Sequence, residues 1–261
     1  QVLQAVALES FDAFVVLINA ADSRKALFFN LNLLLVTNYT LYYMHDHVTY
    51  DVPTMSCGDV DQKRKDMIVA TTSGRLYSFA CRLVTQVSNG GIDKKCRPIK
   101  TFQAIQRGKI KIDTTLGKMA KQICTVDINS TFLMLCDTGA IQCCESSNLE
   151  PLWTVGSGCF RDPPTKIWGD KFGCYFAVYC RSSVPNNAGT LELWLPPESY
   201  NLCMSGHFFR ALMNLDGENS SCDGLKGLCI ESIDARNAHV LIAQGNGQLQ
   251  LWLVKKSHVQ L

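Results

Sequence analysis

Three consecutive residues with metal-ligating side chains, His45, Asp46 and His47, stand in the stretch MHDHVTY. On a β-strand, His45 and His47 would point to the same side, so their imidazoles could hold a metal ion together. A zinc site needs further protein ligands at a regular spacing, and the sequence contains no Cys-x-x-Cys pair to supply them. We therefore expect polar residues at the end of a strand here, and no metal.

Cysteine is the second residue type that could carry chemistry, because the chain has 13 of them. Their number is odd, and most stand in apolar runs such as FLMLCDTGAIQCC, where buried free Cys acts as a small hydrophobic residue. Adjacent Cys143 and Cys144 would face opposite sides of a strand, which suits packing better than a disulfide or a zinc site. A reducing compartment, cytoplasm or nucleus, fits this usage, and an extracellular location is the alternative.

Catalytic motifs are sparse. GSGCF, at residues 156–160, lacks the spacing of a Gly-x-Ser-x-Gly nucleophile elbow, and neither kind of Gly-rich phosphate loop occurs. Thirteen Cys and five His leave a Cys–His pair open, but the Cys lie mainly in expected strands rather than at helix starts. We expect a protein that is not an enzyme and that has no cofactor.

Basic residues gather between residues 94 and 122, where the sequence holds nine of its 25 Lys and Arg and one acidic residue, Asp113. The nine are Lys94, Lys95, Arg97, Lys100, Arg107, Lys109, Lys111, Lys118 and Lys121. Alternation in GKIKID predicts a strand with lysines toward solvent and isoleucines inward. Such a strip could bind phosphates or an acidic partner. The alternative is an edge strand that its lysines protect from aggregation.

Composition bounds the remaining choices. With 47% hydrophobic and 18% charged residues in 261, the chain can bury a substantial core, and a net charge of +2 does not by itself indicate a nucleic-acid or membrane partner. A membrane-spanning helix needs about 20 apolar residues, and every apolar run in the sequence is much shorter. The first residue is Gln, which favours an excerpt or a processed chain.

The elements that must position all these residues are repeated hairpins. An apolar run, a polar turn with Gly and the pattern Gly-x-(Leu/Ile)-x-x-(aromatic or Cys) recur at GRLYSF, GAIQCC, GTLELW and GQLQLW, which begin at Gly74, Gly139, Gly189 and Gly247. Gly permits the positive φ of a tight hairpin turn. LLLVTNYTLYYM reads as a degenerate copy with its turn at Asn38 and Tyr39, and FVVLINAADSRKALFF as a sixth hairpin without Gly.

Flanking segments supply further strands. KQICTVDI, PLWTVG, TKIWGD and GLCIESIDA fall before or after the hairpins, which gives units of strand, hairpin and strand. The glycines are 65, 50 and 58 residues apart, against roughly 40 to 50 for a four-stranded propeller blade. We attribute the excess to inserted loops, chiefly a basic insertion at about 86–121. The prediction is an all-β fold: one β-propeller domain over residues 1–261 with about five to seven four-stranded blades, complete or partial.

These units resemble degenerate WD repeats and the related quinoprotein-like repeats. NGQLQLWLV and AGTLELWLP resemble the end of a WD repeat, Gly206-His207 stands where such a repeat often has Gly-His, and GAIQCCESSNLEPLWTVGSG is similar to a quinoprotein-like unit. The resemblance covers residues 67 to 254, but Leu rather than Asp follows Trp194 and Trp252. No residue set matches a quinone site.

The resemblance and the lack of a convergent polar site lead to one functional expectation. We expect a non-catalytic protein–protein interaction platform, a propeller subunit of a larger intracellular multiprotein assembly whose partners are other protein subunits. Two alternatives stay open: a propeller that contacts nucleic acid through the basic residues, and an accessory quinoprotein-like repeat domain of an enzyme. Fold alone does not choose between them.

Overall fold

The computed structural model describes most of the chain, and within that part it is all β. The described residues are 1–86, 99–126, 130–160, 162–170, 176–181, 189–195, 209–214, 225–234, 237–244 and 249–255. Two single 3-10 turns, η1 (Glu9–Phe11) and η2 (Ser157–Cys159), interrupt the strands of this part. None of its helical segments has the length or hydropathy of a membrane span.

Every larger sheet is an antiparallel meander whose strands follow chain order. The first holds β1 (Val2–Leu8), β2 (Ala13–Asn19), β3 (Arg24–Asn30) and β4 (Leu35–Thr40); the second holds β7 (Met55–Asp61), β8 (Asp66–Thr71), β9 (Arg75–Gln86) and β10 (Ile99–Lys111). The third holds β11 (Ala120–Val126), β12 (Thr131–Cys136), β13 (Ile141–Glu145) and β14 (Pro151–Val155). The fourth holds β15 (Pro164–Gly169), β16 (Phe176–Cys180), β17 (Thr190–Leu195) and β18 (Phe209–Asn214). The fifth described sheet holds β19 (Leu225–Asp234), β20 (Asn237–Gln244) and β21 (Leu249–Lys255), and β5 (Tyr42–His45) pairs with β6 (Val48–Asp51) alone.

The four hairpins predicted from the Gly pattern are confirmed. β8 pairs with β9, β12 with β13, β16 with β17 and β20 with β21. Gly74, Gly139 and Gly189 have φ of 71°, 88° and 101°, the left-handed region that the turn requires. Gly247 lies outside the described residues, as does Gly206-His207. The hairpin without Gly is also confirmed, since β2 pairs with β3.

The hairpin predicted at Asn38 and Tyr39 is wrong. Both residues lie inside β4, where Asn38 pairs with Leu27 and Tyr39 with Ala26 of β3. The chain instead turns after β5, at Asp46 and His47, whose φ of 49° and 64° are those of a two-residue hairpin turn. Asp can adopt this positive φ as Gly does, so a prediction that relies on Gly or Asn places the turn at the wrong residues.

The flanking strands are confirmed, and the predicted insertion contains one more. KQICTVDI, PLWTVG, TKIWGD and GLCIESIDA overlap β11, β14, β15 and β19. Ile99–Lys111 is β10, which pairs with β9 along nearly its whole length and forms the outer edge of the second sheet. This part of the basic segment is therefore a strand of a regular sheet, and residues 87–98 lie outside the described part.

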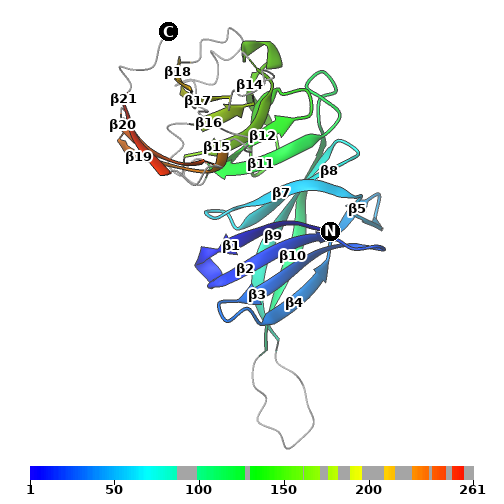
Figure 1. The fold of residues 1–261 in the computed structure, drawn as a ribbon. Coiled ribbons are helices and arrows are strands. Elements are labelled where there is room, and N and C mark those ends of the chain that lie inside the picture. Colours follow the sequence, from blue (N-terminus) through cyan, green and yellow to red (C-terminus); the bar gives the residue numbers. More distant parts are fainter. Residues whose placement is uncertain are drawn as a thin grey trace, which may run out of the picture.

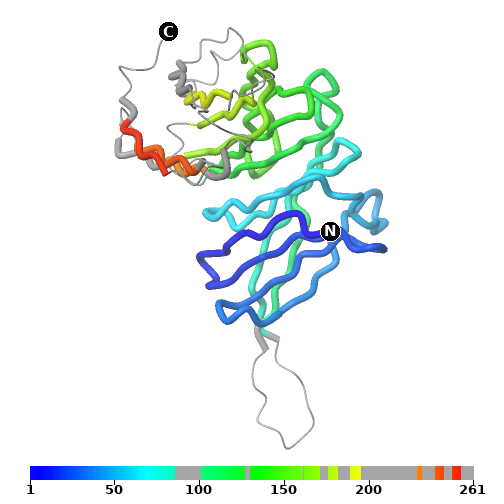
Figure 2. Tube along the Cα trace, viewed as in Figure 1, coloured from blue at the N-terminus to red at the C-terminus, as the bar shows by residue number. Residues whose placement is uncertain are grey.

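The first strands of the five larger sheets lie side by side in chain order (Figure 1). β1 lies beside β7, β7 beside β11, β11 beside β15, and β15 beside β19. Four-stranded meanders that stack with their first strands together are propeller blades. Figure 2 traces the same progression from the blue first sheet to the red last one. In the described residues β19 is not packed on β1 in this way, so the sheets form an open arc.

The core consists of layers between successive sheets. Val15 and Phe28 of the first sheet share a cluster with Val69 of the second. Ile68 of β8 packs with Phe132 of β12, and Leu133 of β12 packs with Val178 of β16. Because neighbouring residues of β8, β12 and β16 face two different layers, all their residues are buried. This position explains why these strands consist almost entirely of apolar residues.

Candidate interaction surfaces

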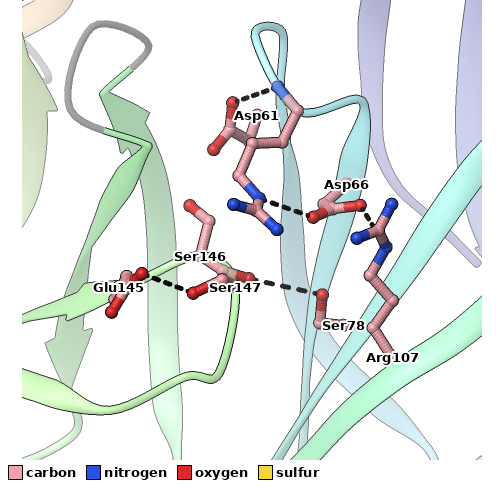
Figure 3. A network of polar contacts seen from close by, with 8 residues as sticks. Asp61, Asp66, Ser78, Arg107, Glu145, Ser146 and Ser147 are labelled. Atoms are coloured by element: carbon pink, nitrogen blue, oxygen red, sulfur yellow. Dashed lines mark hydrogen bonds and ion pairs between the residues drawn. The ribbon is translucent and has the colours of Figure 1, made fainter.

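Arg107 is the best-defined member of the basic set, and its role is internal. It stands at a β-bulge of β10, between Gln106 and Gly108, and such a bulge re-aims a side chain. Its Nε lies 3.1 Å from Oδ1 of the fully buried Asp66, and the Nε of Arg64 lies 3.0 Å from the other carboxylate oxygen. Figure 3 shows this network. The side chain of Arg107 therefore forms an ion pair with a buried carboxylate inside the protein.

A separate hydrogen bond in the same view ties the second sheet to the third (Figure 3). The backbone N–H of Arg64 donates to Oδ1 of Asp61 at 3.0 Å, and the hydroxyl of Ser78 donates to the backbone carbonyl of Ser146 at 3.4 Å. Ser146 lies in the turn after β13 (Figure 3). Each oxygen of Asp66 lies close to an arginine Nε, whereas Oδ2 of Asp61 is buried without a hydrogen-bond partner in the described part. The arrangement indicates stabilisation of an inter-sheet junction.

The remaining basic residues divide into three groups. Lys109 places its Nζ 4.6 Å from the ring centroid of Tyr43, a cation–π contact. Lys111 ends β10, Lys118 lies in the connection to the third sheet and Lys121 lies in β11, and all three are exposed. Lys100 lies in β10, whereas Lys94, Lys95 and Arg97 fall outside the described residues. Ile112 is buried and Ile110 packs against the core, which confirms the predicted inward isoleucines. The structure thus brings four of the nine onto one strand and pairs two of them internally.

Hairpin β5–β6 is the surface feature that the sequence reasoning missed. Tyr43 anchors it: its ring centroid lies 5.2 Å from Tyr77 of β9 and 5.5 Å from Tyr50 of β6. The backbone N–H of Met44 donates to Oε1 of Gln106 at 2.7 Å. The hairpin is therefore held on the second sheet by contacts that include the Tyr43 ring on Tyr77, Lys109 on Tyr43 and the hydrogen bond from Met44.

Both faces of this hairpin expose apolar side chains. Tyr42 and Met44 lie on one face, paired with Asp51 and Thr49, and Val48 and Tyr50 lie on the other face, paired with His45 and Tyr43. Aromatic residues and Met are enriched at protein–protein interfaces. The missed signal was the two-residue turn at Asp46 and His47, which sets Tyr42–His45 against Val48–Asp51. His45 and His47 serve this turn: Nδ1 of His45 lies 2.9 Å from Asp46, and no group of three potential metal ligands occurs among the described residues.

The cysteines of the described part are free thiols. Burial raises the pKa of Cys57 and of Cys81 to about 12, with the Asp59 and Asp66 carboxylates adding to the respective shifts, and it raises the pKa of Cys136 to about 11. Burial also raises the pKa of Cys144. Since a thiol must ionise to act as a nucleophile, these four are packing residues at neutral pH.

This shift predicts a loss of stability in alkali. An unfolded thiol ionises near its ordinary pKa of 9.0, while folded Cys81 stays protonated up to about 12, so the unfolded state loses its proton first and the fold weakens as pH rises above 9. We expect Cys81→Ala to flatten the decline in unfolding free energy between pH 8 and pH 10 by about 1 kcal/mol, measured by urea denaturation. Cys159→Ala, at an exposed thiol, is the matched control and should leave the decline unchanged. Equal declines in all three proteins would contradict the assignment.

Comparison with known proteins identifies the fold and nothing narrower. No family model and no curated protein sequence matches the chain. Among solved structures, it is similar to BBS1N, determined in complex with ARL6DN, with a TM-score of 0.51, 15% identity and coverage of 97% of this chain and 64% of that one. It is also similar to KlHsv2 with loop 6CD replaced by a Gly-Ser linker, with a TM-score of 0.51, 10% identity and coverage of 97% and 70%. Both are propellers. The chain has a β-propeller fold.

The length of these matches also matters. The chain spans 64% of the BBS1N chain and 70% of the KlHsv2 chain. Assignment to the WD-repeat class stays a prediction, as does the number of blades.

Proposed function

We propose that this protein is a non-catalytic interaction platform, a propeller subunit of a larger multiprotein assembly. The observation that carries the proposal is the face of hairpin β5–β6 that exposes Tyr42 and Met44, while Tyr43 on the other face packs on Tyr77 of β9. Exposed Tyr and Met are residue types that are enriched at protein–protein interfaces, and anchoring of their hairpin to a sheet lowers the entropy lost on binding. The similar propeller BBS1N was solved in complex with a protein, ARL6DN, and this supports a protein partner.

The proposal places the protein in the cytoplasm or nucleus. Nine free cysteines in the described part support a reducing compartment. Buried thiols and the internally paired Arg107 do not face a partner, and the proposal assigns the partner to the exposed aromatic and Met side chains of the hairpin. We expect other protein subunits as its ligands.

Removing the apolar hairpin side chains tests the proposal. We expect Tyr42→Ser/Met44→Ser to lower recovery of a stoichiometric protein partner at least tenfold, because central apolar contacts carry most of an interface's binding energy. The measurement is affinity capture of the full protein from its source cells at high salt, with quantitative mass spectrometry.

Leu34→Ser/Leu35→Ser, at a similarly exposed apolar pair where β4 begins, is the matched control and should retain the partner. Both variants should unfold at the urea concentration of the parent protein. Equal loss in both variants would contradict the hairpin as the site. Recovery of nucleic acid alone, released by salt, would overturn the platform in favour of the lysines on and after β10.

A further inference from the structure

The turn between β3 and β4 exposes four leucines to solvent. Leu31, Leu33 and Leu34 are 61%, 72% and 63% exposed, and Leu35, where β4 begins, is 53% exposed. Single exposed apolar side chains are common on protein surfaces, but four within five successive residues form a patch that needs an explanation. All four lie outside the core layers between the sheets, so packing within the fold does not provide one. Residues 31–35 are called the leucine turn below.

The backbone of the leucine turn satisfies its own hydrogen-bond donors. The N–H groups of Asn32 and Leu34 both donate to Oδ1 of Asn30 at 3.0 Å, and the N–H of Leu33 donates to the Asn30 carbonyl at 2.9 Å. The N–H of Asn30 donates in turn to the Leu34 carbonyl at 3.1 Å. One asparagine therefore closes the turn, and three successive N–H groups at its tip need no partner from outside it.

Leu33 stands where a leucine is expensive. Its φ is 59°, in the left-handed region that Gly or Asn adopts at lower cost. Because its side chain is 72% exposed, the strain is not repaid by packing within the protein. A strained and exposed apolar residue points to a role outside the folded chain.

The leucine turn lies in a long uncharged part of the sequence. No Asp, Glu, Lys or Arg occurs from residue 26 to residue 45. The β1–β2 turn, which lies beside the leucine turn because Ala13 pairs with Asn30, carries the exposed acids Glu9 and Asp12. Attraction to anionic groups therefore contributes little at this place, and transfer of apolar surface from water must supply the binding.

A lipid bilayer fits these properties better than a groove on a protein does. Hydrocarbon offers no hydrogen-bond partners, so a segment that enters it needs satisfied backbone donors and no charge. The leucine turn meets both requirements. A protein interface, by contrast, adds about one hydrogen bond for every 100 to 200 Å² that it buries, and this turn keeps its tip N–H groups for itself.

We propose that the leucine turn inserts into the boundary between headgroups and acyl chains of a lipid bilayer, and so places this propeller on a membrane surface. The contact is peripheral, with the leucine side chains in the bilayer and the sheets in water. The four side chains hold about 16 carbon atoms, comparable with the single acyl chain that gives reversible membrane binding of about 10⁴ M⁻¹. The leucine turn precedes β4 and hairpin β5–β6 follows it, so the two surfaces lie at opposite ends of that strand (Figure 1). The inference goes beyond the interaction platform and does not rest on it.

Vesicle sedimentation tests the proposal. The purified full protein is mixed with phosphatidylcholine vesicles at about 0.1 M and at about 0.5 M NaCl, and we expect similar binding at both, because salt screens charges and not apolar transfer. Leu34→Ser/Leu35→Ser should lower the partition coefficient at least about tenfold, because it removes half of the inserted leucines. Asn30→Asp should lower it as much: the carboxylate still accepts the two N–H groups, but it puts a charge at the base of the turn.

The matched control is Leu251→Ser/Leu253→Ser, which removes two exposed leucines of β21. It should bind vesicles as the parent protein does. All variants should unfold at the urea concentration of the parent, so that a loss of binding reports the turn and not the fold. The platform fails separately, because its partner is captured as a protein and is lost in Tyr42→Ser/Met44→Ser.

Four results would overturn the proposal. The first is no sedimentation with neutral vesicles, and the second is an equal loss in the Leu251→Ser/Leu253→Ser control. Binding that needs anionic lipid and disappears at high salt would assign the membrane contact to the basic β7–β8 turn, residues 62–65, instead. A dimer that forms without vesicles and is dispersed by Leu34→Ser/Leu35→Ser, measured by sedimentation velocity, would assign the leucine turn to self-association.

Discussion

Replacing both Arg64 and Arg107 by Met is expected to lower the free energy of unfolding by about 3 to 5 kcal/mol, more than the sum of the two single changes. Asp66 is fully buried, with one arginine on each carboxylate oxygen at 3.0 and 3.1 Å. Either single variant leaves the charge one partner, and the arginines are 32% and 40% exposed, so each single loss should be about 1 kcal/mol. The double variant leaves a buried carboxylate without a cation.

Neutralising that carboxylate gives the matched control. In the double-Met background, Asp66→Asn removes the uncompensated charge and should recover more than half of the lost stability, because an amide is much cheaper to bury than a carboxylate. Urea denaturation of the five proteins gives the coupling energy. If the two Arg→Met losses of unfolding free energy simply add, or if Asp66→Asn recovers no stability, the burial of Asp66 does not require these two arginines.

This network shows the limit of reading charge from sequence. The run from Lys94 to Lys121 could be seen as basic, and the strand within it could be predicted from the alternation in GKIKID. Nothing in the local pattern shows that a bulge turns Arg107 toward Asp66, because that acid stands 41 residues earlier and meets it only through the pairing of β8, β9 and β10. A charge run therefore predicts a strand better than it predicts a binding surface.

The hairpins were predictable for a local reason, and the ends of the arc were not. Gly74 and Gly139 mark their turns because the positive φ is a property of a few adjacent residues. Hairpin β5–β6 escaped because Asp46 and His47 take the same backbone without Gly. Local sequence does not show whether a strand is buried on one face or on both. β2 and β16 are similarly apolar, but β16 is fully buried and β2 is only partly buried, because the two strands differ in what packs on them.

Gly74→Ala is expected to lower the free energy of unfolding by about 3 kcal/mol. Gly74 has φ of 71°, which costs about 1 to 2 kcal/mol for a residue with a side chain. A Cβ there would also stand 2.4 Å from the backbone carbonyl oxygen of Lys118, in the connection to the third sheet. Because the obstacle is backbone, the turn or the connection must move, and the hydrogen bond from Ile112 N–H to the Gly74 carbonyl would be strained with it.

Two other glycines separate the causes of that loss. Gly139 has φ of 88°, but a Cβ there would lie 3.1 Å from the side-chain atom Pro164 Cδ and farther from its other neighbours, so Gly139→Ala should cost about 1 to 2 kcal/mol, mainly backbone strain. Gly156 has φ of −68° and nothing within 4 Å of an added Cβ, so Gly156→Ala should be neutral. The measurement is urea denaturation of the three variants. If Gly74→Ala and Gly139→Ala lower the free energy of unfolding equally, the close approach of Gly74 to Lys118 adds nothing to the loss. That result would contradict tight packing between the β8–β9 turn and the connection to the third sheet.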